Sequence, residues 1–331
     1  SQGTKLSKYQ IYAAAWAVHR SITISNREII KHIKNKYDSL IEEGYEIEDY
    51  DSSMNFYTAE FSVFEYLFGL GKYLCEKYEH LFSSSSDPDQ EDSIGFNVTN
   101  ICLGLKFGKM DELPSTLLKK DLTKFETALL DSIDIVFNAL KGYISLKMNK
   151  RERVVVPHTE LQIVSMIGKV FHSKYDENLE VKSNSSDKLS RLRANLPYHY
   201  LFDIVREYWR GSGDSKAFEL STIERYENAI TAKSWHSTLD EWFLLELEKR
   251  EKSRVRIKDS SILFLKYLYT HSMSANDELS DKKFDLEHLV PIARLKEIAG
   301  ENGIPISAFP NLCLLDMELN RSKGESTFYE F

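Results

Sequence analysis

The amino-acid sequence predicts a mainly α-helical protein whose C-terminal end forms a small β-β-α unit. Apolar residues recur at the helical period along most of the chain up to about residue 275. Beyond that point, short alternating stretches are separated by Pro291, Pro305 and Pro310, a pattern typical of short strands and loops. The chain has 331 residues, of which 42% are hydrophobic, and this is enough to bury the core of one large domain or two ordinary ones.

The N-terminal part is expected to contain three helices followed by a loop. Residues 5–24 and 27–43 each place apolar side chains near the helical period, and residues 55–80 form a third helical stretch rich in aromatic side chains. The segment SSSSDPDQEDS, residues 83–93, is acidic, contains a proline and has no apolar side chain. We therefore predict a flexible surface loop at this segment.

The middle of the chain is expected to be helical as well. Helices are predicted over residues 115–146, from Thr159 to about residue 171, and over residues 198–209, 220–250 and 258–272. The stretch RGSGD carries two glycines, which end the helix that precedes it. A soft domain boundary is placed just before the last of these helices.

The C-terminal part is expected to fold as strand, loop, strand and short helix. Residues 284–290 and 311–315 each read as a short strand. Residues 316–323 read as a short helix that follows the second strand directly. This order of elements differs from the helical pattern of the preceding chain and defines the fold class: mainly α, with a small β-β-α unit at the end.

Composition excludes some classes of protein. The chain carries 43 basic and 51 acidic residues, for a net charge of −8, so a uniformly basic protein that coats nucleic acid is excluded, whereas a local positive groove stays open. Cys75, Cys102 and Cys313 form no CxxC pair, which argues against a zinc knuckle and suits a reducing, cytoplasmic location. No apolar run approaches the roughly 20 residues that span a bilayer.

Two stretches concentrate positive charge in this acidic chain. They are SLKMNKRERVVVPH and DKLSRLRANL. Each is either a solvated face or a surface that follows a DNA backbone. Trp235 and His236 leave a similar choice, between core packing and contact with a base.

Two C-terminal segments bring together residues suited to metal and proton chemistry. The first, FDLEHLVP, places two carboxylates and an imidazole just before a proline, and the second, PNLCLLDMELNRSK, adds two amides and two cations. The residues concerned are Asp285, Glu287, His288, Asn311, Asn320, Arg321 and Lys323. On their own, Arg321 and Lys323 are equally well explained as cations near a helix C-terminus.

These residue types match the needs of phosphodiester hydrolysis. A neutral imidazole, such as that of His288, takes a proton from water at neutral pH. A hard divalent cation held by oxygen ligands stabilises the charge that develops on phosphate, and Glu287 and Asn320 offer such oxygens. Because Glu287 and His288 are adjacent, a regular strand would send them to opposite faces. A strand end or bulge ahead of Pro291 would let them converge.

The layout resembles the HNH nuclease motif, also called the ββα-metal or His-Me finger, in its Asn-terminated form. That resemblance implies His288 as general base, Glu287 and Asn320 as ligands of a single Mg²⁺ or Mn²⁺, and Asn311 as the residue that ties down the loop orienting the base. It also implies that Asp285, Arg321 and Lys323 lie behind the ligands or contact phosphate. Glu287 stands where Asp is more usual, and its longer side chain would move the metal.

A wider resemblance is to GmrSD-like, modification-dependent (type IV) restriction endonucleases. EHLVP, NLCLL and the later Asn resemble that family's nuclease signature, and SQGTKLSKYQIYAAAW and YWRGSGDSK resemble two further segments. The resemblance implies a helical region over residues 1–255, an HNH nuclease domain over residues 256–331, and a nucleotide-hydrolysing domain upstream of Ser1. It implies a cytoplasmic restriction and antiviral defence role, with foreign or modified DNA as the partner and no membrane partner.

A different class of function stays open beside the endonuclease. The C-terminal unit would then be a catalytically inactive, HNH-derived scaffold, or a DNA-binding or interaction module that keeps the fold without the reaction.

Overall fold

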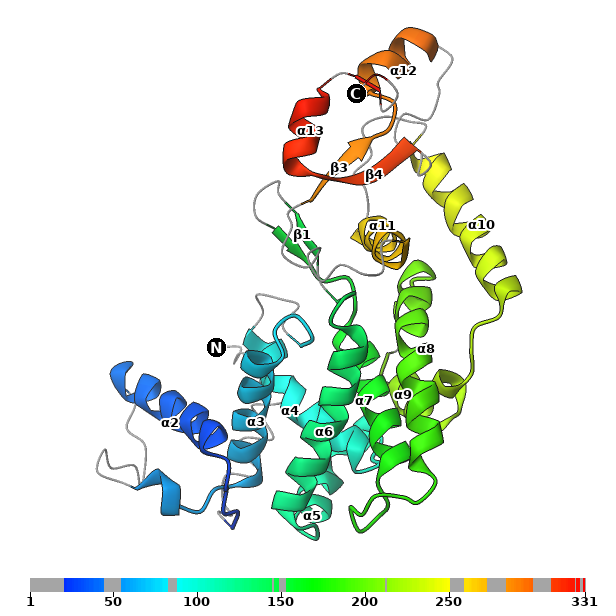
Figure 1. Cartoon of the computed structure of the whole chain (residues 1–331). Helices are drawn as coiled ribbons and strands as arrows, with labels where there is room; N and C mark the ends of the chain where they lie inside the picture. Colours follow the sequence, from blue (N-terminus) through cyan, green and yellow to red (C-terminus); the bar gives the residue numbers. More distant parts are fainter. Residues whose placement is uncertain are drawn as a thin grey trace, which may run out of the picture. The chain divides into compact units, whose positions relative to one another are not determined.

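The structure is a computed structural model whose described part is mainly helical, with a small antiparallel strand pair near the C-terminus (Figure 1). This confirms the predicted fold class at the level of helices and strands. None of the helices in the described ranges is both long and apolar enough to cross a membrane. The structure describes residues 21–44, 55–82, 88–144, 146–148, 153–211, 213–250, 259–272, 284–299, 311–324, 326–327 and 330.

The chain divides into two compact units, each built from several separate segments. The first comprises residues Ser1–Asn138, Thr159–Ala194 and Gly211–Asn228. The second comprises Ala139–His158, Asn195–Arg210 and Ala229–Phe331. The C-terminal strands and helix that carry the candidate site therefore share a unit with segments from the middle of the chain.

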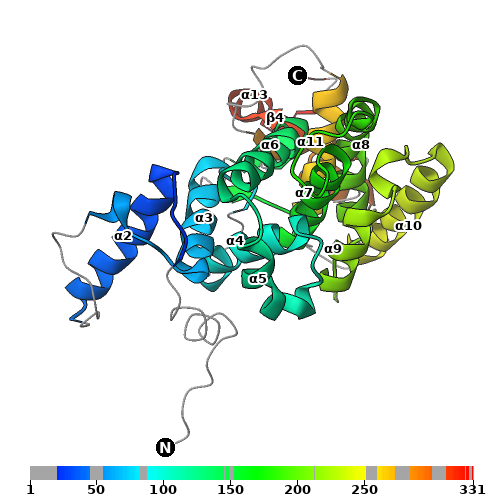
Figure 2. The same cartoon turned by 90° about the horizontal axis from the view of Figure 1, so that it is seen from below.

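The first unit is built of helices. Figures 1 and 2 show α2, α3 and α4 side by side, and α7 packs against α4 and α9. Its elements are α2 (Arg27–Glu42), η1 (Phe56–Thr58), α3 (Val63–Lys77), α4 (Pro88–Cys102), η2 (Phe107–Glu112), α5 (Leu113–Leu117), most of α6 (Leu122–Leu140), α7 (Glu160–Lys174), the start of α8 (Ser185–Val205), α9 (Gly213–Thr222) and η3 (Arg225–Glu227).

Side-chain caps fix where several of these helices begin. Asn26 accepts a hydrogen bond from the backbone N–H of Glu28 at the start of α2. Ser62 and Glu65 form a reciprocal capping box at the start of α3, with bonds of 3.2 and 2.6 Å. Thr159 caps α7. Such caps satisfy backbone N–H groups that a helix leaves without an internal partner, and they stabilise each start by about 1 kcal/mol.

Glycines let the central helices of this unit approach closely. A Cβ at Gly95 of α4 would lie 1.9 Å from the backbone oxygen of Leu67 in α3. A Cβ at Gly168 of α7 would lie 2.7 Å from Ile101 of α4 and 2.9 Å from Ser221 of α9. The close contacts, with backbone at Gly95 and with side chains at Gly168, therefore require the absence of a side chain at these two positions.

An ion triad around a buried carboxylate ties three elements of the first unit together. Glu227 of η3 is 3% exposed, forms an ion pair with Lys169 of α7 at 2.7 Å and accepts a hydrogen bond from Arg191 of α8 at 3.0 Å. A carboxylate without water needs such partners, because an uncompensated buried charge costs several kcal/mol. The triad therefore sets how η3 lies on α7 and α8.

The second unit combines helices with short strands. Its sheet order is β2-β1-β3-β4, with β1 antiparallel to β2, β3 antiparallel to β4, and β1 joined to β3 by the single parallel pair Met148 and Phe284. Besides the end of α8, its elements are β1 (Leu146–Met148), β2 (Arg153–Val155), α10 (Ala232–Arg250), α11 (Asp259–Ser272), β3 (Phe284–His288), α12 (Ile292–Ala299), β4 (Leu312–Asp316) and α13 (Met317–Lys323).

Helix α11 is the centre of the second unit because it packs in two directions. Phe264 joins a buried cluster with Val205 of α8 and Trp242 of α10. Ile262 and Leu265 join a second cluster on the strand pair. The other buried members of that second cluster are Leu312 and Leu314 of β4, with Phe284 and Leu286 of β3 packed against it.

Several predicted elements agree with the structure. The helices predicted to begin at about residues 27, 159 and 258 correspond to α2, α7 and α11. The two C-terminal strands and the short helix predicted after them correspond to β3, β4 and α13. Residues 5–20 of the first predicted helix, which covers residues 5–24, lie outside the described residues. Its last residues are not helical, because Ile22 forms a β-bridge with Phe61.

Other predictions were wrong in their boundaries or missed an element. Residues 88–93 of the predicted acidic loop belong to α4, which begins with Pro88, a residue tolerated in the first turn. The long helix expected over 115–146 is two helices, and Asp121 accepts from the backbone N–H of Lys124 at the break. The sequence patterns also missed α9, α12 and the strands β1 and β2.

The close approach at Gly95 predicts a large effect of one methyl group. We expect Gly95→Ala to lower the free energy of unfolding by about 1–3 kcal/mol, because the added carbon would overlap the α3 backbone. Thermal and urea unfolding measure the change. Gly108→Ala is the matched control, because nothing lies within 4 Å of a Cβ there. Equal stability of the two variants would contradict this packing.

Candidate active site

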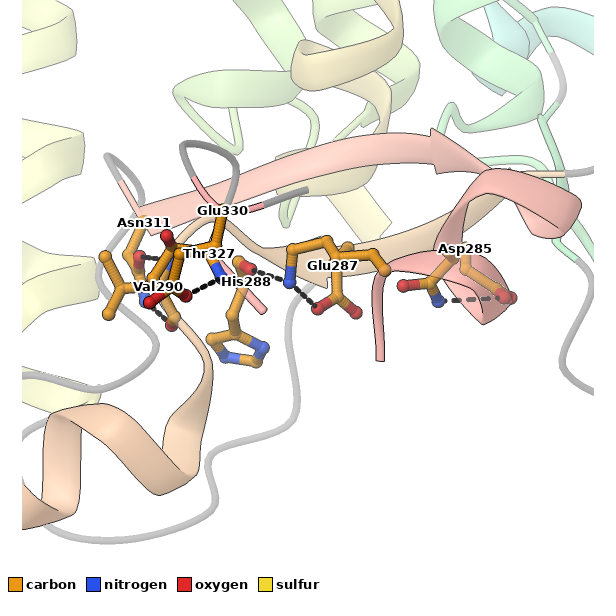
Figure 3. Close-up of polar contacts among 9 residues, drawn as sticks. Asp285, Glu287, His288, Val290, Asn311, Thr327 and Glu330 are labelled. Carbon is orange, nitrogen blue, oxygen red and sulfur yellow. Dashed lines mark hydrogen bonds and ion pairs between the residues drawn. The ribbon is translucent and has the colours of Figure 1, made fainter. Parts of the chain in front are cut away.

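The strand pair presents two different faces. In β3, Phe284 and Leu286 pack against the core beside α11. Because side chains alternate along a strand, Asp285 and Glu287 project to the opposite face. Helix α13 packs against both β3 and β4, and Figure 3 shows Asp285 and Glu287 bonded to side chains next to them. The two carboxylates predicted for the site therefore share one face.

A buried ammonium holds the end of β3. Lys323 of α13 donates to Oε1 of Glu287 at 2.9 Å and to the backbone oxygen of His288 at 3.2 Å. The Lys323 side chain is 0% exposed, and that of Glu287 is 19% exposed. Taking an ammonium out of water is costly unless it is paired and hydrogen-bonded. The ion pair is therefore a strong constraint on both Glu287 and the backbone of His288.

The other predicted ligand, Asn320, contacts the second carboxylate. Its side-chain nitrogen donates to Oδ2 of Asp285 at 3.2 Å. Asp316 caps the short helix that carries Asn320, accepting from the backbone N–H of Glu318 at 2.9 Å. The helix cap at Asp316 and the hydrogen bond from the Asn320 side chain to Asp285 together fix Asn320 beside β3.

The loop that follows His288 is held by Asn311. The Asn311 side chain accepts from the backbone N–H of Val290 at 2.8 Å and donates to the Val290 oxygen at 3.1 Å. The backbone oxygen of Asn311 also accepts from the N–H of Leu289 at 2.8 Å. A side-chain amide is suited to this double contact because it carries both a donor and an acceptor. The backbone is thus fixed within two residues of the imidazole.

His288 departs from the alternation expected of a regular strand. Figure 3 shows its imidazole on the same side of the β3 ribbon as the carboxylate of Glu287. Strand β3 ends at His288, and the contacts of Lys323 and Asn311 lie on either side of this strand end. The imidazole of His288 and the carboxylate of Glu287 therefore lie on one side of β3, although the two residues are consecutive.

The oxygen donors of this face are chemically suited to a divalent metal. Within the described ranges, Oε2 of Glu287 and Oδ1 of Asn320 carry no hydrogen bond. Mg²⁺ and Mn²⁺ prefer such carboxylate and amide oxygens, with water and phosphate oxygens completing the coordination. The described residues hold no cluster of three or more His, Cys, Asp or Glu, so an ion here would depend on an amide and on outside oxygens.

Two neighbours of the site have clear places in the structure. Arg321 is exposed on α13, where a cation is available to solvent. Cys313 lies opposite Glu287 in the strand register and is 2% exposed. Burial, and next the nearby Glu287 charge, raise the pKa of the Cys313 thiol. The thiol is therefore protonated at neutral pH, which suits a core residue and not a metal ligand.

The role of Lys323 as a partner of Glu287 was not evident from sequence. A lysine near a helix C-terminus is ordinarily solvated, and the sequence signal was its position three residues after Asn320 on one helix face.

Comparisons with protein families, with curated proteins and with solved structures found no match.

The double contact of Asn311 predicts a local change on substitution. Asn311→Asp would keep the acceptor for the N–H of Val290 but would place a carboxylate against the Val290 oxygen. We expect faster amide hydrogen exchange at Leu289 and Val290 and a free energy of unfolding lower by about 1–3 kcal/mol. Ser322→Ala, which removes an exposed hydroxyl on α13, is the control. Unchanged exchange in Asn311→Asp would show that the loop is held by other contacts.

Proposed function

We propose that the protein is a metal-dependent endonuclease of the HNH class that hydrolyses DNA phosphodiester bonds in a restriction and anti-phage defence system. The observation that supports it most is the strand end at His288. There, Asn311 binds the following backbone on both its N–H and its oxygen, while Glu287 and the imidazole lie on one side of β3.

In this proposal His288 is the general base. Its neutral imidazole takes a proton from a water molecule, and the water oxygen forms a bond to phosphorus while the bond from phosphorus to the 3′ oxygen breaks. Asn311 acts through His288, because it fixes the loop behind the imidazole. Such a base contributes about 10²–10⁴-fold to the rate.

Glu287 and Asn320 would hold a single Mg²⁺ or Mn²⁺ through Oε2 and Oδ1. When bound, the ion would polarise the phosphate and stabilise the leaving 3′ oxygen. Asp285 would orient Asn320, to which it is bonded at 3.2 Å. Arg321, which is exposed on α13, would meet the phosphate, whereas the Lys323 ammonium is occupied inside the protein by Glu287 and the His288 carbonyl.

The wider role follows from the resemblance of the sequence to GmrSD-like enzymes. We propose that the helical region positions the nuclease and relays a signal from a nucleotide-hydrolysing domain upstream of Ser1. Foreign or modified DNA would be the substrate, and the protein would act in the cytoplasm.

A second function is favoured by one specific contact. The Lys323 ammonium already pairs with Oε1 of Glu287, as expected of a unit that has replaced its metal by an internal cation. In that case the protein would be a catalytically inactive scaffold or a DNA-binding module with the same fold.

A plasmid-nicking assay distinguishes these functions. With Mn²⁺, the wild-type protein is expected to nick supercoiled plasmid DNA, and His288→Ala to lower the nicking rate at least about 100-fold, because the general base is lost. Circular dichroism checks that the variant is folded.

The control for this assay is another histidine of the same unit. His271 is exposed on α11, where it stacks on Tyr267 with ring centroids 5.4 Å apart, and His271→Ala should nick at the wild-type rate. Equal nicking by the wild type and His288→Ala would remove His288 from the reaction and overturn the proposed mechanism.

A further inference from the structure

The Lys323–Glu287 pair changes the charge that a metal ion would encounter. Asp285 and Glu287 each contribute a negative charge to this face of β3, and Lys323 contributes one positive charge at 2.9 Å from Glu287. The three side chains together leave one net negative charge. A divalent cation at the open oxygens of Glu287 and Asn320 would make the local charge positive.

We propose that Lys323 keeps the affinity of the site for divalent metal low until a phosphodiester arrives. This inference rests on the proposed function. A phosphodiester carries one negative charge, so metal and phosphodiester together leave the site neutral, whereas metal alone leaves it with one net positive charge. Each ligand therefore strengthens the binding of the other, and thermodynamic linkage makes the two effects equal.

Burial is what gives the Lys323 charge this influence. Its side chain is 0% exposed and its ammonium is fixed by two acceptors, Oε1 of Glu287 and the oxygen of His288. Water and salt screen an exposed cation strongly but a buried one much less. Lys323 also cannot turn away into solvent without leaving both acceptors. By contrast, the neighbouring cation Arg321 is exposed, so its repulsion of a metal ion is screened.

The same contacts make Lys323 a positioning residue. It holds Oε1 of Glu287, which leaves Oε2 to face an incoming ion. It also holds the backbone oxygen of His288, to which its ammonium donates at 3.2 Å. Lys323 therefore has two effects on the site. Its ammonium orders the carboxylate of Glu287, and its positive charge opposes the binding of a metal ion.

Direct measurement of Mn²⁺ binding tests this inference without any reading of activity. Free Mn²⁺ is followed by electron paramagnetic resonance during titration of the whole chain, with no DNA present. We expect Lys323→Met to bind Mn²⁺ at least about tenfold more tightly than the wild type, because the opposing charge is removed. Lys323→Arg, which keeps the charge, should bind as weakly as the wild type.

The matched control removes an exposed cation from the same unit. Arg294 of α12 is 52% exposed and pairs with Glu297 at 3.5 Å, and Arg294→Met should leave Mn²⁺ binding unchanged. Should Lys323→Met lose its thermal transition, Lys323→Gln carries the same test, because its amide keeps hydrogen-bond donors without the positive charge.

A second arm measures the coupling itself. In the His288→Ala background, in which DNA is expected to stay intact, a short DNA duplex should tighten Mn²⁺ binding. Adding Lys323→Met should reduce that tightening severalfold, because most of the metal affinity is then present without DNA.

The outcomes separate this inference from the proposed function. Wild-type affinity or weaker binding in both Lys323→Met and Lys323→Gln would overturn the inference, and nicking that depends on His288 would then leave the nuclease proposal standing. Tighter binding in these variants without any nicking by the wild type would support the charge effect and overturn the nuclease. No Mn²⁺ binding by any variant, with or without DNA, would overturn both.

Discussion

Glu287 and His288 are consecutive residues of one strand, and a regular strand would carry their side chains to opposite faces. Everything in the candidate site depends on how the chain escapes this constraint. Strand β3 ends at His288, Lys323 binds the carbonyl of that residue, and Asn311 binds Val290 just beyond it. The departure from regular geometry is therefore held by specific polar contacts at His288 itself and at the backbone that follows it.

The apolar side of the strand pair gives these contacts a firm support. Phe284 and Leu286 pack against a cluster that includes Ile262 and Leu265 of α11, so β3 cannot rotate without exposing them. A one-residue shift in register would move the carboxylates into that core and the apolar residues toward α13. The hydrophobic pattern thus determines which face is polar, and the ion pair and amide contacts determine the geometry on that face.

The elements predicted correctly from the sequence are those whose signal is local. Thr159 stands directly before α7 as its cap, and the alternation in FDLEH and the short helix after Asp316 are visible within a few residues. Predictions were wrong where an element is held by residues far along the chain. The start of α4 was predicted as an acidic loop because its residues are polar. The contacts that hold α4 come from other helices, as at Gly95, which lies against Leu67 of α3.

The candidate site shows the same division between local and distant information. The residue types of Glu287, His288, Asn311 and Asn320 are readable from their two segments. The burial of Lys323 is not, since its partner Glu287 lies 36 residues earlier in the chain. Nor could any local pattern place β1 next to β3, because that pairing joins Met148 to Phe284.

Crystallographic anomalous scattering from Mn²⁺ shows directly whether Glu287 and Asn320 hold a metal ion. His288→Ala would be crystallised as the full chain with a short DNA duplex and Mn²⁺. We expect one anomalous peak within bonding distance of Oε2 of Glu287 and Oδ1 of Asn320. A phosphate oxygen of the DNA should be a further ligand of the ion, and Lys323 should still donate to Oε1 of Glu287. A DNA complex with its phosphates at this face but no Mn²⁺ on Glu287 and Asn320, or with Mn²⁺ bound by other residues, would contradict this expectation.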